Sequence, residues 1–253
     1  MSANYCVVIP TYDNPLTLEA VVERVREHVA DVIVVDDGSG EEARAVARSL
    51  QTRGRATVFF RETNGGKGAA VLSGLAVAKE RGFSHALQLD ADGQHDTDDI
   101  PRFIAASKSN ERALVLGQPV FDSSAPRGRL WGRKVSVLFC AIETMSARVG
   151  DPLCGFRVYP VGPTLATKPS GRVMDFDPEI AVRLAWAGLP ILHVSTRVKY
   201  IGRDEGGVSH YRGFADTLKI SLMHTRLCIE GVFRVLTGQF GRRLPAGESN
   251  PPS

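Results

Sequence analysis

The sequence predicts an α/β protein in which helices cover both faces of a mostly parallel central sheet. Through residues 1–117, short runs of β-branched and apolar residues alternate with helical patterns. This alternation is typical of strand–helix–strand units, whose strands pair in parallel. Polar clusters end several of these runs, and ligands bind at that edge of an open parallel sheet. The expected strands are residues 5–9, 32–35, 57–60, 86–89 and 113–116.

Local signals mark the ends of the intervening helices. Asn14-Pro15 predicts a capping side chain followed by proline at the first helical position. Ser39 and Glu42 have the spacing of a capping box at the next helix. Gly82 stands where the helix over residues 68–81 is expected to end.

The second half is less regular and is expected to complete the same domain. Residues 127–148 begin as a basic loop and continue as a helix from about Gly132. Further strands are expected at 156–159 and 191–198, with a helix at about 178–187 between them and a longer helix over 214–236. We interpret residues 1–237 as one domain, and 238–253, rich in Gly, Pro and Ser, as a disordered tail.

Composition and charge restrict the class of protein. A net charge of +3 over 253 residues is too small to indicate nucleic-acid binding. Four dispersed cysteines without a Cys-x-x-Cys pair favour a reducing cytoplasm over a disulfide scaffold or a zinc site. No signal-peptide pattern and no run of about 18 apolar residues are present. We therefore expect a cytoplasmic protein, either free or peripheral on the inner face of the membrane.

The segment Leu89-Asp90-Ala91-Asp92-Gly93-Gln94-His95 is the most informative part of the chain. Side chains at i and i+2 of a strand point the same way, so Asp90 and Asp92 can face one cation at the strand end. Carboxylate oxygens suit Mg²⁺ or Mn²⁺, which share their coordination with substrate phosphates. A polar turn is the alternative, because Asp-Gly is a common turn dipeptide. His95 is either a group behind the metal ligands or a solvated loop residue.

Other polar clusters follow the first two strands and precede the third helix. After the first strand, Pro10-Thr11-Tyr12-Asp13 offers the Tyr12 ring to a nucleobase. After the second, Asp37 of Asp36-Asp37 can accept hydrogen bonds from base or ribose, with helix capping as the alternative. Asn64-Gly65-Gly66-Lys67-Gly68 offers free N–H groups and a lysine to an anion. It is not a Walker A loop, and we interpret Lys67 as lying near a diphosphate rather than as a solvated charge.

Five motifs resemble those of family 2 glycosyltransferases with the GT-A fold. In order, they are VVIPTYDN, IVVDDGS, NGGKGAA, LDADGQH and DPLCGFRVY. The resemblance covers residues 6–212 and is strongest to the polyprenyl-phosphate (dolichyl-phosphate) mannosyl- and glucosyltransferases. The second half also resembles soluble members found with aryl-polyene pigment synthesis. The resemblance implies inverting, metal-dependent transfer of a sugar from a nucleotide-diphosphate sugar to a lipid-type acceptor, either a polyprenyl phosphate or a hydroxylated lipid.

The same resemblance implies roles for individual residues. Asp92 and Gln94 would bind Mg²⁺ or Mn²⁺, with Asp90 beside them on the nucleotide side. Asp151 falls where relatives place a carboxylate beside the acceptor, and Arg133 would meet a phosphate or acceptor anion. The nucleotide would be lined by Pro10, Tyr12, Asp13 and Asp37, and a loop carrying Arg203, Ser209 and His210 would close over the diphosphate. Relatives often have Glu at the position of Asp13 and Lys at that of His210.

The acceptor determines whether proton transfer is needed. A lipid phosphate is already an anion, whereas a hydroxyl needs a general base within hydrogen-bond reach. Residues 126–148 hold five basic residues against one acid, Glu143, which favours an anionic acceptor or a membrane surface, with a solvated face as the alternative. Asp151 is the predicted general base and Asp177 the second candidate. A buried structural aspartate is the alternative for both.

The helix over 214–236 is amphipathic. Charged residues interrupt it, which excludes a bilayer span but allows it to lie in the membrane interface. Packing on the sheet or on a second subunit fits the apolar stripe equally well. The stripe lies opposite Lys219, Arg226 and Arg234, and consists of Phe214, Leu218, Leu222, Ile229, Val232, Phe233 and Leu236.

Three other classes of protein fit parts of the sequence. A sugar nucleotidyltransferase would carry a Gly-rich basic loop where this chain has Pro10-Thr11-Tyr12-Asp13. A receiver domain would share an acidic pair such as Asp36-Asp37, but in about half the length. A non-catalytic subunit that binds a nucleotide sugar or lipid carrier would not be expected to retain Asp90, Asp92, Asp151 and Lys67 together. The sequence identifies neither the sugar, the nucleobase nor the oligomeric state.

Overall fold

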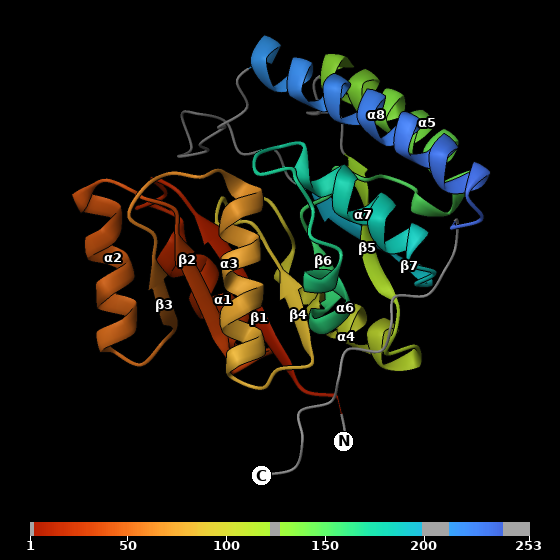
Figure 1. Cartoon of the computed structure of the whole chain (residues 1–253). Coiled ribbons are helices and arrows are strands. Elements are labelled where there is room, and N and C mark those ends of the chain that lie inside the picture. Colours follow the sequence, from red (N-terminus) through yellow and green to blue (C-terminus); the bar gives the residue numbers. More distant parts are fainter. Residues whose placement is uncertain (1–2, 122–126, 199–212, 240–253) are drawn as a thin grey trace.

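A single seven-stranded sheet forms the centre of the molecule (Figure 1). The computed structural model describes residues 3–121, 127–198 and 213–239. Each of the seven segments expected to be a strand is a strand in the structure. The strands lie in the order β3-β2-β1-β4-β6-β5-β7, with bounds β1 Tyr5–Thr11, β2 Val32–Asp36, β3 Thr57–Phe60, β4 His85–Gln88, β5 Leu114–Phe121, β6 Arg157–Pro160 and β7 Ile191–Val198.

The sheet is mostly parallel, as predicted. β1 pairs in parallel with β2 and β4, with Val8 opposite Ile33 on one side and Gln88 on the other. β2 pairs in parallel with β3, and β5 with β7. β6 is antiparallel to both of its neighbours, β4 and β5. This reversed strand carries the end of the DPLCGFRVY motif back toward the centre of the sheet.

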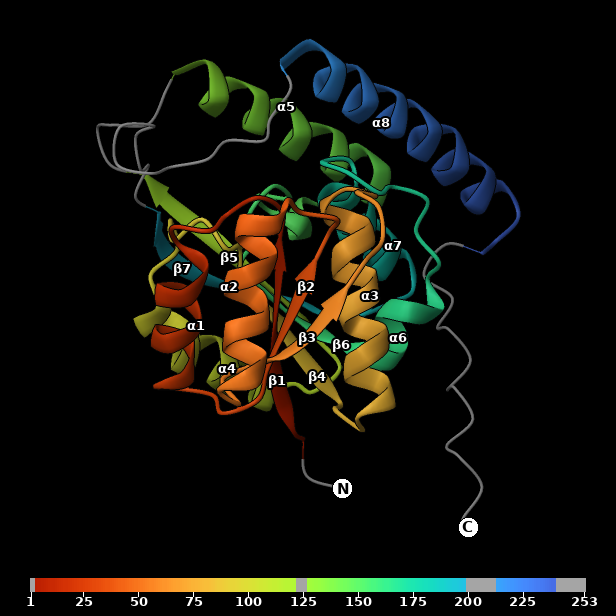
Figure 2. The same cartoon turned by 90° about the vertical axis from the view of Figure 1, so that its left-hand side faces the viewer.

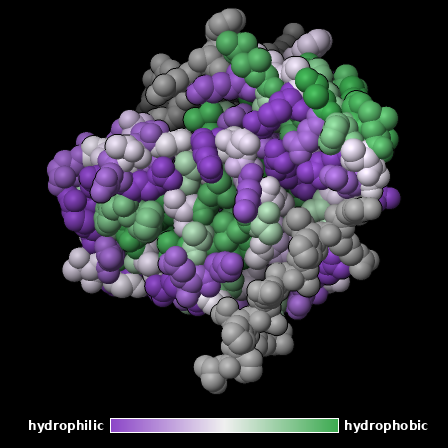
Figure 3. Space-filling model, viewed as in Figure 1, coloured by the Kyte–Doolittle hydropathy of each residue, from purple (hydrophilic) through white to green (hydrophobic). Residues whose placement is uncertain are grey.

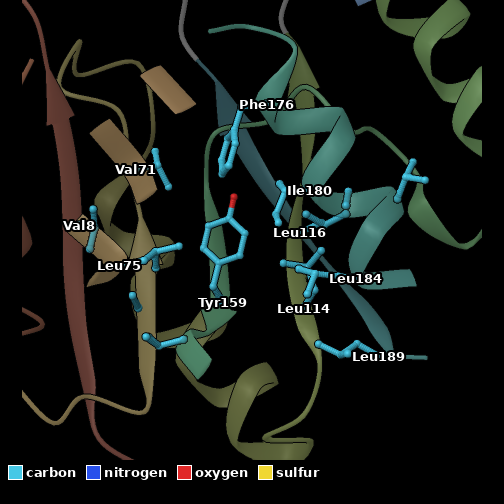
Figure 4. Packing of buried hydrophobic residues seen from close by; sticks show 14 of the residues in the cluster. Val8, Val71, Leu75, Leu114, Leu116, Tyr159, Phe176, Ile180, Leu184 and Leu189 are labelled. Carbon is cyan, nitrogen blue, oxygen red and sulfur yellow. The ribbon is translucent and has the colours of Figure 1, made fainter. Parts of the chain in front are cut away.

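Helices cover both faces of the sheet, and alternate residues of β1 contact the two layers. Val8 belongs to the cluster under α3, α6 and α7, part of which is shown in Figure 4. Val7 and Ile9 belong to the cluster under α1, α2 and α4. The bounds are α1 Leu18–Arg26, α2 Glu41–Thr52, α3 Lys67–Glu80, α4 Ile100–Ser109, α6 Val161–Ala166 and α7 Phe176–Trp186, with 3-10 helices η1 Thr97–Asp99 and η2 Ala147–Val149.

Some predicted helix ends are confirmed and others are wrong. α3 ends just before Gly82, whose φ of +81° suits a residue without a β-carbon. The capping box is absent: α2 begins after Gly40, and the Ser39 hydroxyl instead accepts a hydrogen bond from the amide of Asp13. α1 begins at Leu18, three residues beyond Pro15, because the Asn14 amide group donates to the carbonyl of Tyr12 rather than capping a helix there.

Two long helices, α5 (Arg127–Thr144) and α8 (Gly213–Leu236), lie side by side as a layer at one end of the molecule (Figures 1 and 2). α5 begins five residues before Gly132, so the expected basic loop is helical, in keeping with the good helix propensity of arginine and leucine. In α8, Met223, His224 and Leu227 are buried against the rest of the protein. Among the described residues, no helix is long and apolar enough to cross a membrane.

The apolar stripe predicted on α8 faces outward. Leu218, Leu222, Ile229, Val232, Phe233 and Leu236 are all between 48% and 79% exposed. Arg226, from the opposite side of the helix, instead reaches inward to Glu179 at 2.7 Å. Packing of the stripe on the sheet is therefore excluded. The side chain of Phe214 and the tail beyond Gln239 lie outside the described residues.

Candidate active site

The carboxyl ends of β1, β2 and β4 meet at one edge of the sheet. These strands are adjacent and parallel, and Thr11 at the end of β1 lies opposite Asp36 at the end of β2. The polar segments after the three strands therefore lie at the same edge, as expected for a binding site in this class of sheet. The loop before α3 joins them there, since Asp37 accepts hydrogen bonds from the amides of Gly65 and Gly66.

Lys67 is the central cation of the site. Its Nζ lies 2.9 Å from Oδ1 of Asp90 and 2.9 Å from Oδ2 of Asp177. Burial alone would lower the pKa of Lys67, but the two carboxylates outweigh it and raise the pKa. Burial would likewise raise the pKa of Asp90, and the charges of Lys67 and His95 instead hold it well below its usual value. Lys67 is thus a mostly enclosed lysine, 18% exposed and paired with two carboxylates, which excludes the interpretation as a solvated surface charge.

Asp92 is the carboxylate at this edge that is best suited to a divalent cation. Burial, followed by the charge of Asp90, raises its pKa. One of its oxygens accepts a hydrogen bond from the amide of Gln94 at 3.0 Å. A divalent cation would offset both the burial and the repulsion from Asp90, and the oxygen donors of Asp90, Asp92 and Gln94 suit Mg²⁺ or Mn²⁺. The residues present therefore fit such an ion.

His95 lies behind the acidic pair. Its ring is buried, with Nε2 3.8 Å from Oδ2 of Asp90, and it packs edge-on against Phe156. This position supports the first of the two interpretations of His95, a group behind the metal ligands, and excludes a solvated loop residue.

Asp37 and Asp13 organise the loops on the nucleotide side. Asp37 is buried, forms an ion pair with Arg61 at 2.8 Å, and has its pKa raised by burial. Asp13 has a φ of +49°, and its Oδ1 accepts a hydrogen bond from the amide of Gly40 at 2.8 Å. Pro10 is buried and Tyr12 is half-buried at the end of β1. These residues are at the predicted edge, and the carboxylates already have partners within the protein.

Asp151 and Arg133 form an ion pair near the start of the DPLCGFRVY segment. The Arg133 Nε donates to Oδ2 of Asp151 at 2.7 Å, and the other oxygen of Asp151 accepts from the amide of Leu153. The guanidinium of Arg133 also lies over the ring of Phe121. The structure thus joins the predicted acceptor-binding residue to the predicted general base. Arg203, Ser209 and His210 lie outside the described residues.

Two residues that contact the candidate site were not among the predicted ones. Arg157 is completely buried, donates to the carbonyl oxygens of Pro152, Cys154 and Asp177, and lies 3.7 Å from Oδ1 of Asp177. Gly155 packs so closely against Asp90 and Lys67 that a β-carbon there would overlap Asp90. Both residues lie within the DPLCGFRVY motif, which was the available signal, but neither was assigned a role of its own.

The sheet order, the single reversed strand and the acidic edge define the GT-A class of glycosyltransferase fold. Solved structures agree. Glucosyl-3-phosphoglycerate synthase of Mycobacterium tuberculosis, crystallised with Mn²⁺, UDP-glucose and phosphoglyceric acid, has a TM-score of 0.67 at 17% identity, over 89% of this chain and 80% of that one. The same synthase in complex with UDP has a TM-score of 0.66. At this identity the likeness establishes the fold, which confirms the expected GT-A architecture.

The chain belongs to glycosyl transferase family 2, because the sequence model of that family matches residues 6–162. It is 33% identical over 162 residues to the polyprenol monophosphomannose synthase of Mycolicibacterium smegmatis, covering 60% of each chain. It is also 29% identical over 170 residues to the UDP-N-acetylglucosamine–dolichyl-phosphate N-acetylglucosaminyltransferase of Methanococcus voltae, covering 60% of this chain and 68% of that one. Membership confirms the predicted enzyme class, a glycosyltransferase, and favours it over a nucleotidyltransferase or a receiver domain.

Proposed function

We propose that this protein transfers a sugar from a nucleotide-diphosphate sugar to a polyprenyl phosphate, with inversion at the anomeric carbon and with Mg²⁺ or Mn²⁺ as cofactor. One observation carries the proposal: the acidic pair Asp90 and Asp92 lies at the sheet edge with Lys67 bound to Asp90 and Asp177. The names of two relatives support the substrate class, since the synthase from Mycolicibacterium smegmatis and the undecaprenyl-phosphate mannosyltransferase from Micrococcus luteus are both named for polyprenyl carriers.

On the donor side, the acidic pair and its neighbours would hold the metal and the diphosphate. Asp92, Asp90 and Gln94 would bind the divalent ion, which when bound stabilises negative charge on the leaving nucleoside diphosphate. Lys67 keeps Asp90 ionised and in position. We assign Pro10, Tyr12, Asp13 and Asp37 to the nucleotide, and Arg203, Ser209 and His210 to the diphosphate.

On the acceptor side, a phosphate needs positive charge rather than a base. We assign Arg133 to the acceptor phosphate. Arg133 lies on α5, the helix whose outer surface is apolar, and it forms an ion pair with Asp151. Asp151 would serve as general base only toward a hydroxyl acceptor. Asp177 is less suited to that role, because it is buried between Lys67 and Arg157.

The surface of the α5–α8 layer suits an acceptor that is anchored in a membrane. Trp131, Leu138 and Ile142 on α5, and Met145 just after its end, are each more than half exposed, and they extend the outward stripe of α8. Figure 3 shows hydrophobic residues gathered at this end of the molecule. Peripheral contact with a lipid surface would bring the acceptor phosphate to Arg133.

Sugar transfer to a polyprenyl phosphate is the direct test. Purified protein is supplied with a panel of nucleotide sugars, a polyprenyl phosphate and Mg²⁺ or Mn²⁺, and products are identified by mass spectrometry. We expect Asp92→Asn to reduce turnover by about 100-fold or more, because one side chain that holds the metal is lost. Asp98→Asn, an exposed residue near the same loop, is the matched control and should retain turnover. Near-normal turnover of folded Asp92→Asn would refute the proposal.

A further inference from the structure

We propose that α5 and α8 together bind a Zn²⁺ ion through Cys140, Glu143 and His224. This group lies between the two helices, and none of its members contacts the candidate active site through a hydrogen bond or ion pair that we find in the described structure. Each of the three residues can present one ligand atom such that all three atoms lie within 4.8 Å of one another. The site would be structural, joining two helices that the sheet does not hold together.

The three side chains are buried and already face one another. Their exposed fractions are 0% for Cys140, 2% for Glu143 and 3% for His224. Oε1 of Glu143 lies 2.8 Å from Nδ1 of His224, and Nε2 of the same ring lies 3.4 Å from the Ser136 hydroxyl. A hydrogen bond from the second ring nitrogen is how proteins orient a metal-binding histidine. The arrangement therefore includes a group that can support the imidazole as a ligand.

One oxygen of the cluster has no partner. Oε2 of Glu143 is buried and forms no hydrogen bond. A buried carboxylate oxygen without a partner is costly, and a cation is the usual remedy. Binding of a metal ion would displace the thiol proton into solvent.

The donor set selects the metal. Sulfur, imidazole nitrogen and carboxylate oxygen together are typical ligands of Zn²⁺, whereas Mg²⁺ and Ca²⁺ take oxygen ligands. Cys228 lies beside the group, with its Sγ 4.0 Å from Oε1 of Glu143, but only the other three residues have ligand atoms within 4.8 Å of one another, so a solvent molecule or a moved Cys228 would complete the coordination. Cys140 and Glu143 are three residues apart on α5, and His224 and Cys228 are four apart on α8. Each helix thus contributes a pair from one face.

Such an ion would connect α8 to the acceptor side of the active site. α5 carries Arg133, which binds Asp151, and its other end carries Cys140 and Glu143. Holding α8 against α5 would fix the outer layer relative to the sheet. The function assigned to the ion is stability of this layer, and it is independent of the sugar-transfer reaction.

The test uses the full-length protein and Co²⁺ as a spectroscopic substitute for Zn²⁺. Protein treated with chelator and then dialysed is titrated with Co²⁺, and absorption is recorded. We expect a thiolate-to-cobalt charge-transfer band and visible bands of a tetrahedral ion, both removed by adding Zn²⁺. Elemental analysis of protein purified without chelator should find about one zinc per chain. Zn²⁺ should also raise the Tm of the metal-free protein.

Variants locate the site and separate it from the active site. Cys140→Ser and Glu143→Gln should lose the charge-transfer band or weaken Co²⁺ binding strongly, and Ser136→Ala should weaken it about 10-fold. Cys6→Ala, which removes an equally buried thiol from β1, should keep the band, and so should Asp92→Asn. Wild-type protein that shows neither the band nor a zinc-dependent Tm would overturn the proposal, whatever the variants do, and would leave a buried Glu143–His224 hydrogen bond. A band that persists in Cys140→Ser would also overturn it.

Discussion

Lys67 shows how one side chain organises the candidate active site. Its ammonium group joins Asp90, at the end of β4, to Asp177, at the start of α7, and so connects two halves of the chain. Removing the ammonium would leave the buried carboxylate of Asp177 and the partly buried carboxylate of Asp90 without their shared cation, which is a costly kind of change. The site is therefore held by charge pairing as much as by packing.

Gly155 packs directly against the Lys67–Asp90 ion pair, with no room for a side chain. A β-carbon there would overlap Oδ2 of Asp90 and lie 2.8 Å from Nζ of Lys67. We expect Gly155→Ala to displace both side chains and to lower sugar transfer about 100-fold, since misplacement by about 1 Å has that effect on a preorganised site. The measurement is turnover of the folded variant.

Gly162→Ala provides the matched control for that substitution. A β-carbon at Gly162 would meet nothing within 4 Å, so turnover should be unchanged, and stability should be equal or slightly higher because Gly162 lies in α6 and alanine favours a helix. Equal turnover in the two variants would show that the close approach of Gly155 to Asp90 has no functional importance.

At the scale of elements, Glu179 connects α7 to the preceding loop and to α8. This buried carboxylate accepts hydrogen bonds from the amides of Ser170 and Gly171, and it forms ion pairs with Arg183 at 2.6 Å and with Arg226 of α8 at 2.7 Å. Burial would raise its pKa, but these donors outweigh burial and lower the pKa from the ordinary 4.5. The ionised form of Glu179 therefore stabilises the contact between α7 and α8.

The stability that Glu179 contributes should depend on pH. Because its pKa is lower in the folded protein, the contribution is complete above about pH 4.5 and is lost as the pH falls through the folded-state value. We expect Glu179→Gln to lower the free energy of unfolding by about 2 kcal/mol at neutral pH. The loss should be smaller than on breaking a fully buried ion pair, because Arg226 is partly exposed. The difference from wild type should shrink below pH 4.5. Urea unfolding of both proteins at neutral pH and below pH 4.5 measures this difference.

Glu42→Gln is the control for the pH experiment. Glu42 is exposed in the first turn of α2, so its substitution should change stability little at either pH. A wild-type to Glu179→Gln difference that stays constant with pH would contradict the assigned role of Glu179.

At the scale of the whole molecule, the outward apolar surface of α5 and α8 is the most unusual feature. The two helices form a layer away from the first half of the sheet, and their outer side chains are apolar and exposed (Figures 1 and 3). A large exposed apolar patch of this kind is typical of a surface that contacts a membrane or another protein. The length of α8, about 36 Å, is enough to lie along a lipid surface.

We expect this surface to bind lipid vesicles. Replacing Leu222, Ile229 and Phe233 together by Ser should release the protein from anionic vesicles in a sedimentation assay, because three exposed apolar side chains would no longer enter the interface. Leu16→Ser, which removes a side chain that is 76% exposed elsewhere, should bind as wild type does. If the triple variant binds vesicles normally but has become monomeric, the surface is instead an interface between subunits.

Much of the fold was predictable because its signals are local. The apolar runs and glycine or proline signals determine where strands and helices occur, and all seven strands were located. The acidic pair at the end of β4 and the glycine-rich loop before α3 are also contiguous in sequence. The wrong helix starts at Pro15 and Ser39 have one cause: Asn14 and Ser39 form tertiary or turn hydrogen bonds in place of capping ones.

Residue pairings across long separations could not be predicted. The partners of Lys67 at Asp177, of Asp37 at Arg61 and of Asp151 at Arg133 depend on how the elements pack. The spacing of the cysteines argued against a zinc site, because ligands from two helices leave no pattern in a linear reading. Cys140, Glu143 and His224 come together only when α8 packs on α5.

The sequence by itself determined the class of sheet, the family and the position of the acidic edge, because periodicity and motif order are properties of neighbouring residues. The tertiary structure alone decided that β6 runs antiparallel, that Arg157 is buried beneath Asp177, and that the apolar stripe of α8 faces outward. An amphipathic helix has the same pattern whichever side it buries. Its orientation follows from what the opposite side can bind, here Glu179 and the buried cluster around Glu143.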